Sequence, residues 1–160
     1  MTGFRIAVRR CLALLGRRGP AAAPDPGPGL VHALRAEVEA QLTRVELRRA
    51  ELPRGAERAV RRVVRALRVV LDRLDEVFDD GVDRVAAPER LADAVVIVRT
   101  ELAELLDGWF AQPVEMAGDE LVARLALVGD RAERLAARVP DIHARRAEDL
   151  TRELRRRYGP

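Results

Sequence analysis

The sequence has no lysine, no serine and no asparagine, and it contains one cysteine, two histidines and 3% aromatic residues. These gaps exclude a serine nucleophile, a Schiff-base lysine and a phosphate-binding loop that depends on lysine. The lone Cys11 excludes an intramolecular disulfide and a cysteine-rich zinc site, and one free thiol is typical of a reducing cytoplasm. No apolar run approaches the ~20 residues that a transmembrane helix needs.

What is present suits one soluble helical domain. The chain has 160 residues, of which 48% are hydrophobic and 34% are charged, enough for an aliphatic core and for long amphipathic helices. All 29 basic residues are arginine, which we interpret as the codon bias of a GC-rich, bacterial genome. The net charge is +3, so any strong attraction to polyanions has to be local.

Four stretches of the chain carry apolar residues at helical spacing. The most regular ladder has steps of three and four residues throughout and comprises Val60, Val63, Leu67, Val70, Leu74 and Val77. Since an α-helix has 3.6 residues per turn, its members share one face. Val64, Leu71 and Phe78 widen this face, which favours an intramolecular core over a narrow coiled-coil seam.

Glycine and proline separate the predicted helices. The first covers residues 30–52, the second carries the ladder and ends near Gly81, the third runs from Pro88 to just before Pro113, and the fourth ends at Pro140. A short helix follows over residues 141–158. Because short loops make sequence neighbours antiparallel, we expect an all-α fold, an antiparallel up-down four-helix bundle.

Two features refine the third predicted helix. Residues 94–98 are apolar on all sides, so we expect this to be the most buried helix of the bundle. Trp109 lies on its ladder, which has the members Leu91, Val95, Val98, Leu102, Leu105 and Trp109. We expect the indole ring to close one end of the bundle.

Residues 1–18 form a basic amphipathic segment, and residues 19–29 form a linker rich in proline and glycine that tethers it to a bundle over residues 30–160. The candidate contacts with a membrane or a partner are Phe4, Arg5, Val8, Arg9, Leu12 and Leu15. Aliphatic residues surrounded by arginine are typical of an interfacial anchor. A tail, a docking peptide and an export signal are the competing interpretations, although the apolar stretch is short for a signal.

The ladder helix also carries a stripe of arginines two residues out of phase with its apolar face, Arg58, Arg61, Arg65 and Arg68, and it ends in acidic residues. This polarity opposes the helix dipole. The stripe could follow phosphates. We favour pairing instead, because an antiparallel hairpin of the second and third helices brings the stripe level with Glu101, Glu104 and Asp107. Arg155 and Arg156 are further candidate anion contacts.

The sequence predicts no metal or cofactor site. Di-metal bundles use Glu-x-x-His pairs, but Gly29 and Pro140 stand three residues before His32 and His143. The acidic turn at residues 79–83 does not fit a calcium loop, because Phe78 and Ala87 fall at ligand positions. Both histidines are expected at the surface.

We therefore expect a non-enzymatic helical protein that scaffolds or regulates a protein partner. It would be cytoplasmic and held at an anionic membrane surface by residues 1–18. The alternative is a nucleic-acid-binding protein that uses the Arg58–Arg68 stripe and the C-terminal arginines. An enzyme is the least favoured class, since paired bases and nucleophiles are missing. The oligomeric state does not follow from the sequence.

Overall fold

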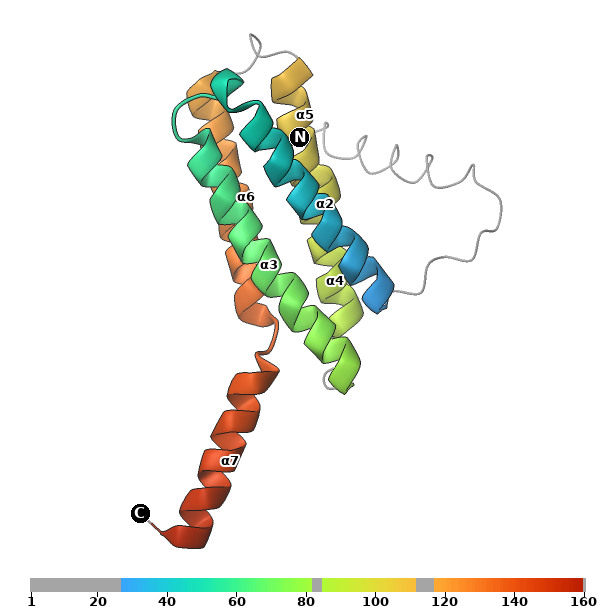
Figure 1. The fold of residues 1–160 in the computed structure, drawn as a ribbon, viewed down its shortest axis with the longest axis vertical. Helices are drawn as coiled ribbons and strands as arrows, with labels where there is room; N and C mark the ends of the chain where they lie inside the picture. Colours follow the sequence, from blue (N-terminus) through green and yellow to red (C-terminus); the bar gives the residue numbers. More distant parts are fainter. Residues whose placement is uncertain (1–26, 82–84, 112–116, 160) are drawn as a thin grey trace, which may run out of the picture.

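The computed structural model describes residues 27–81, 85–111 and 117–159 (Figure 1), and every regular element in these ranges is a helix. The elements are α2 (Pro28–Leu47), η1 (Arg49–Glu51), α3 (Ala56–Asp80), α4 (Ala87–Val95), η2 (Val96–Leu102), α5 (Ala103–Ala111), α6 (Gly118–Arg138) and α7 (Ile142–Tyr158). α4, η2 and α5 follow one another without a break, and we call them together the 87–111 helix. The predicted all-α class is confirmed.

The ladder helix is the centre of the core. All six ladder residues of α3 have no exposed surface, and Val64 and Leu71 beside them are buried as well. Both ends of α3 are set by glycines with positive φ, Gly55 at 91° and Gly81 at 67°, a conformation that costs glycine little. The N–H of Gly81 donates to the carbonyl oxygen of Val77 at 3.1 Å and ends the helix.

Ion pairs identify which helices lie side by side. Each of the four sides of the bundle has an ion pair between adjacent helices. Arg68–Glu39 (2.6 Å) joins α3 to α2, and Arg62–Asp130 (2.8 Å) joins α3 to α6. Arg131–Asp93 (3.7 Å) joins α6 to α4, and Arg99–Glu37 (2.6 Å) joins η2 to α2. Within the described residues no ion pair joins α3 to η2 or α5, or α2 to α6. The second and fourth helices are therefore neighbours, and the second and third are neighbours only near α4.

α3 and α6 lie side by side and run in the same direction in Figure 1, and small residues line their contact. Gly129 is buried, and a Cβ atom there would be in ordinary van der Waals contact, at 3.7 Å from Val63 Cγ2 and from Arg62 Cδ. Ala66 and Ala132 are also buried. The expected hairpin pairing of the second and third helices along their length is wrong, because the face of α3 that would meet the third helix packs instead on α6.

The 87–111 helix changes its period in the middle. Its segment η2 is π-helical, with wider turns than an α-helix. Ala94, Val98, Leu102 and Leu106 are buried at three successive steps of four residues. In a regular α-helix such steps would drift around the axis, and the wider turn keeps them on one face. The expected seam residue Leu105 is therefore only partly buried.

The apolar run at residues 94–98 predicts that the third helix is the most buried one, and this prediction is wrong. Val96 is 39% exposed, whereas α3 contributes ten buried residues. The reason is the position of each helix: α3 packs against both α2 and α6, and the π-helical turn directs Val96 to solvent.

The expected role of Trp109 is confirmed. Its ring is 7% exposed, and its Nε1–H donates to the carbonyl oxygen of Glu51 at 3.0 Å. The adjacent Phe110 ring is covered by the guanidinium groups of Arg44 and Arg48, at 4.9 and 4.1 Å from the ring centroid. These contacts join η1, α2 and α5 at one end of the bundle.

The last helix leaves the bundle (Figure 1, red). Pro140 and Ile142 are buried, and residues 143–159 are all exposed. The predicted range of 141–158 agrees with the observed Ile142–Tyr158 to within one residue.

Candidate interaction surfaces

α7 presents apolar side chains to solvent. We call Ala147, Leu150, Leu154 and Tyr158 the α7 stripe. Leu150 is 58% exposed, Leu154 47% and Tyr158 79%. Their spacing of three and four residues places them on one face of the helix. Six arginines and three acidic residues occupy the rest of α7, so the helix is amphipathic and carries excess positive charge.

The start of α7 is held by polar contacts. Arg73 of α3 donates to the carbonyl oxygens of Ala136 (2.8 Å) and Val139 (3.4 Å) and to Asp141 Oδ2 (3.2 Å). Asp141 caps α7 by accepting from the N–H of Ala144 at 2.9 Å. This backbone hydrogen bond, together with Arg73, lowers the pKa of Asp141. The root of α7 is therefore fixed to α3 and α6, although its stripe contacts neither.

The acidic end of α3 is compensated from outside the helix, as its unfavourable dipole polarity requires. Glu76 lies 3.2 Å from His143 Nε2, and Asp80 accepts from Arg146 at 2.7 Å, so both meet the first turns of α7. Arg35 of α2 meets Asp72 at 2.8 Å.

The structure divides the arginine stripe into two pairs. Arg61 and Arg68 face α2: Arg68 makes two hydrogen bonds to Glu39 (2.6 and 2.7 Å), and Arg61 lies 3.4 Å from Glu46. The hydrogen bonds from Arg68 lower the pKa of Glu39. Arg58 has no ion-pair partner among the described residues, and the same holds for Arg65.

The acids expected to pair with the stripe have other positions. Glu101 pairs with Arg131 of α6, and Asp107 pairs with Arg44 of α2. Glu104 is exposed. Pairing was the right type of interaction for half of the stripe, but the partners lie on α2 because α3 and the third helix are not neighbours along their length.

A surface depression of about 860 Å³ is lined by η1, the first half of α3 and residues of α6. We call it the arginine hollow; it is lined by Arg49, Arg58, Arg61, Arg62, Arg65, Glu57 and Glu133, with Gly55, Ala59 and Val122. Sequence reasoning missed Arg49 and Arg62. The spacing of Arg58, Arg62 and Arg65 by four and three residues was the available signal, since it places all three on one face.

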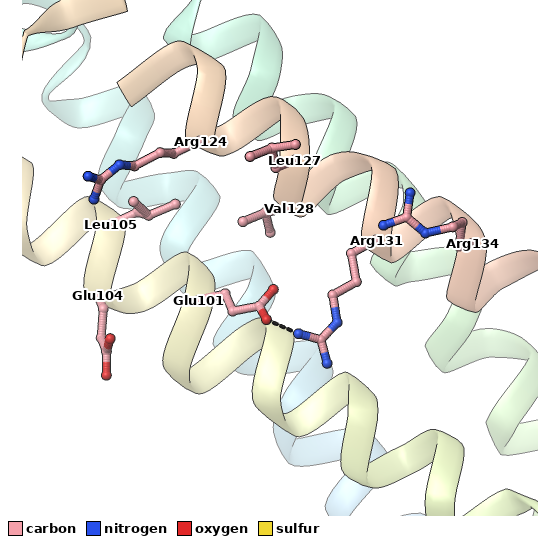
Figure 2. Close-up of a pocket in the computed structure, with 8 residues that line it drawn as sticks. All are labelled: Glu101, Glu104, Leu105, Arg124, Leu127, Val128, Arg131 and Arg134. Atoms are coloured by element: carbon pink, nitrogen blue, oxygen red, sulfur yellow. Dashed lines mark hydrogen bonds and ion pairs between the residues drawn. The ribbon is translucent and has the colours of Figure 1, made fainter. Parts of the chain in front are cut away.

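A second depression, of about 550 Å³, lies between α6 and the 87–111 helix. Figure 2 shows Leu105, Leu127 and Val128 in this groove, with Arg124 at one end and the Arg131–Glu101 pair at the other. Leu127 is 67% exposed. The groove is apolar between charged ends, and such a groove accommodates an apolar side chain of a partner. The sequence pattern did not predict this groove.

The remaining predicted contacts are placed as follows. Arg155 and Arg156 are exposed on the last turns of α7. The candidates Phe4, Arg5, Val8, Arg9, Leu12 and Leu15 lie outside the described residues.

Across residues 27–81, 85–111 and 117–159, no three His, Cys, Asp or Glu side chains gather in a way that could hold a metal ion. Among the helices of the same ranges, none is long and apolar enough to cross a membrane. His32 and His143 are exposed, as expected. No protein-family model, curated protein or solved structure compared with the chain matches it.

Proposed function

We propose that the protein is a non-enzymatic helical interaction protein, a four-helix bundle whose successive helices alternate in direction and which engages a protein partner through α7. The observation that supports this role is the exposure of the α7 stripe, with Leu150 and Leu154 about half exposed on a helix that leaves the bundle. A partner that covers the stripe would remove this apolar surface from water.

The length of α7 supports the same role. A helix of 17 residues is marginal on its own, because most helical stability in proteins comes from packing of an apolar face. Beyond Arg146, which pairs with Asp80 of α3, the ion pairs that support α7 are Arg152–Asp149 and Arg157–Glu153, each of the kind that adds a few tenths of a kcal/mol, roughly 0.2–0.5. Burial of the stripe by a partner would supply the missing packing.

The proposal keeps a cytoplasmic location and a second contact at an anionic membrane surface through residues 1–18. Removal of residues 1–26, which leaves α2 and its N-cap intact, should abolish sedimentation with anionic liposomes while leaving the fold of the bundle unchanged. Equal sedimentation of the full and shortened chains, or none for either, would exclude the membrane contact.

The protein-partner proposal is tested by affinity purification from the native host with two matched double variants. Leu150→Ser with Leu154→Ser removes the stripe, and Leu47→Ser with Leu127→Ser removes two exposed leucines of the bundle, 82% and 67% exposed. We expect a co-purifying protein to be lost with the first pair and kept with the second. Retention with both pairs would contradict a role for α7, and loss with the second pair alone would move the contact to the groove of Figure 2.

Nucleic-acid binding is the second candidate, and the observation that favours it is the lack of a partner for Arg58 and Arg65 among the described residues. It predicts an affinity that falls steeply with salt. Replacement of Arg155 and Arg156 by glutamate should reduce the retention of DNA and RNA if α7 contributes. Unchanged retention would remove the C-terminal arginines from this candidate.

A further inference from the structure

The two faces of the divided stripe differ in what neutralises them. Arg61 and Arg68 pair with acids of α2, whereas Arg58 and Arg65 meet no acid among the described residues. Arg58 and Arg65 line the arginine hollow, and Arg61 lies at its edge toward α2. We propose that the arginine hollow binds two phosphate groups of one polyanionic chain, either inorganic polyphosphate or the backbone of a nucleic acid. This site gives the nucleic-acid candidate a defined place on α3, and it does not depend on the partner proposed for α7.

The positive charge of the hollow exceeds its internal compensation. Five arginines line it together with two glutamates, Glu57 and Glu133. Asp130 and Glu46 pair with Arg62 and Arg61 from beside the hollow, so Arg58 and Arg65 are the lining arginines that have no acidic partner among the described residues. Glu57 is shared by two arginines, Arg49 at 2.7 Å and Arg61 at 2.9 Å. An anionic ligand would supply the negative charge that the lining lacks.

Arg62 gives the hollow a fixed edge. It donates to Glu133 Oε1 at 2.7 Å and to Asp130 Oδ1 at 2.8 Å, which ties α3 to α6. Its hydrogen bonds lower the pKa of Glu133. Arg58 and Arg65 stand one turn before and one turn after this anchor on the same face.

The spacing of the two arginines selects the ligand. Seven residues separate Arg58 from Arg65 along α3, which is about 10 Å at 1.5 Å per residue. A guanidinium group is a planar fork of donors that suits one phosphate at a time. Two such groups at this separation fit two phosphates of one chain better than a single phosphate ion.

Two arginines outside the hollow offer a matched control. In the test variant, Arg58 and Arg65 become glutamine; in the control variant, Arg68 and Arg99 become glutamine, because both pair with glutamates of α2 and neither lines the hollow. Each variant loses two positive charges, so both change the net charge equally. Affinity is measured by fluorescence anisotropy at several salt concentrations with labelled inorganic polyphosphate and with labelled single-stranded and duplex oligonucleotides. The competitors are unlabelled polyphosphate, oligonucleotides, orthophosphate and polyglutamate.

The test variant should lose about tenfold in affinity, and its salt slope should fall by about 1.4–1.8 for the loss of two phosphate contacts. The control variant should stay within about twofold of the wild type, on the same basis that its arginines make no phosphate contact. Binding of labelled polyphosphate that unlabelled oligonucleotides do not displace would assign inorganic polyphosphate as the source, and binding of labelled oligonucleotides that polyphosphate does not displace would assign nucleic acid.

Three results would overturn the proposal. Equal losses in the two variants would mean general charge attraction without a site, and unchanged binding in both would mean that the hollow makes no contact. Competition by polyglutamate as strong as by polyphosphate would show an acidic polypeptide to be an equal ligand. Circular dichroism of each variant verifies that the helices remain folded, because none of the four side chains belongs to the core.

Discussion

The bundle and α7 are both amphipathic, yet they are held in different ways. In the bundle, apolar faces of α2, α3, α6 and the 87–111 helix cover one another, and ion pairs follow each of its four sides. α7 keeps Ile142 in the core and is otherwise attached by Arg73, His143 and Arg146. An apolar stripe therefore does not by itself place a helix in the core; it needs a complementary face, and the chain provides α7 with none in its described part.

The largest test of this difference is a pair of leucine truncations. Leu67 of α3 has no exposed surface, so Leu67→Ala should lower the free energy of unfolding by about 2–5 kcal/mol, through lost burial and a new cavity. Leu154→Ala on α7 should change it by less than about 0.5 kcal/mol. Urea denaturation followed by circular dichroism measures both. A cost for Leu154→Ala that approaches that of Leu67→Ala would show that α7 packs on the bundle.

Removal of Arg73 should have the next largest effect. Arg73→Met breaks its bonds to Ala136, Val139 and Asp141, and we expect a loss of roughly 1–2 kcal/mol, since the side chain is partly exposed. Amide exchange over residues 141–146 should accelerate, whereas exchange in α3 outside the mutated turn should not. Arg134→Met is the control, because Arg134 is exposed. Unchanged exchange at residues 141–146 would mean that Arg73 does not hold the root of α7.

Acid should destabilise both the bundle and the start of α7, in each case by protonating carboxylates whose pKa is lowered in the folded state. The pKa values of Glu39 and Glu133 in the bundle and of Asp141 at α7 are lowered. A lowered pKa stabilises the folded state above the ordinary carboxyl range, and this contribution is lost as the pH falls through the folded-state pKa. Stability should therefore decline below about pH 4.

Single substitutions separate these contributions. Glu133→Gln should flatten the acid dependence of global unfolding, and Asp141→Asn should flatten only that of local exchange at α7, because asparagine still caps the helix. The folded fraction is followed by circular dichroism and the local signal by amide exchange from neutral pH downward. A global acid dependence that is identical in wild type and Glu133→Gln would contradict the assignment to Glu133.

The smallest expected effect on the free energy of unfolding is that of removing the α7 stripe. Leu150→Ser with Leu154→Ser should leave the unfolding free energy of the isolated protein within about 0.5 kcal/mol of the wild type. Any larger loss in the absence of a partner would indicate that the stripe already packs against something, such as a second copy of the chain. Sedimentation velocity of the wild type and the double variant would then identify self-association.

The local features of the fold could be predicted from the sequence. The six ladder residues of α3, the helix ends at Gly55 and Gly81, and the plug at Trp109 all follow from spacing and residue type, which act over a few turns. The choice of neighbours did not follow. The contact of α3 with α6 includes the hydrogen bond from Arg62 to Asp130, 68 residues away, and helical periodicity holds no information on such distant pairings.

The candidate surfaces show the same limit. The stripe on α3 was visible as four arginines, but its division into paired and unpaired halves depends on which helices stand on either side of α3. The π-helical turn of η2 was also not predicted, because the apolar pattern of its residues is compatible with either a regular helix or a short strand. The exposure of α7 was hidden for a different reason: its apolar spacing is that of a packed helix.

The central claim is that α7 is a helix without an intramolecular partner beside a well-packed bundle. Residue-resolved amide hydrogen exchange on the full chain, at low protein concentration and neutral pH, tests it most directly. The account predicts that amides near Leu67 and Leu71 of α3 exchange only through global unfolding, and that amides from Leu150 to Tyr158 exchange with little protection. Protection of α7 equal to that of α3 would contradict it.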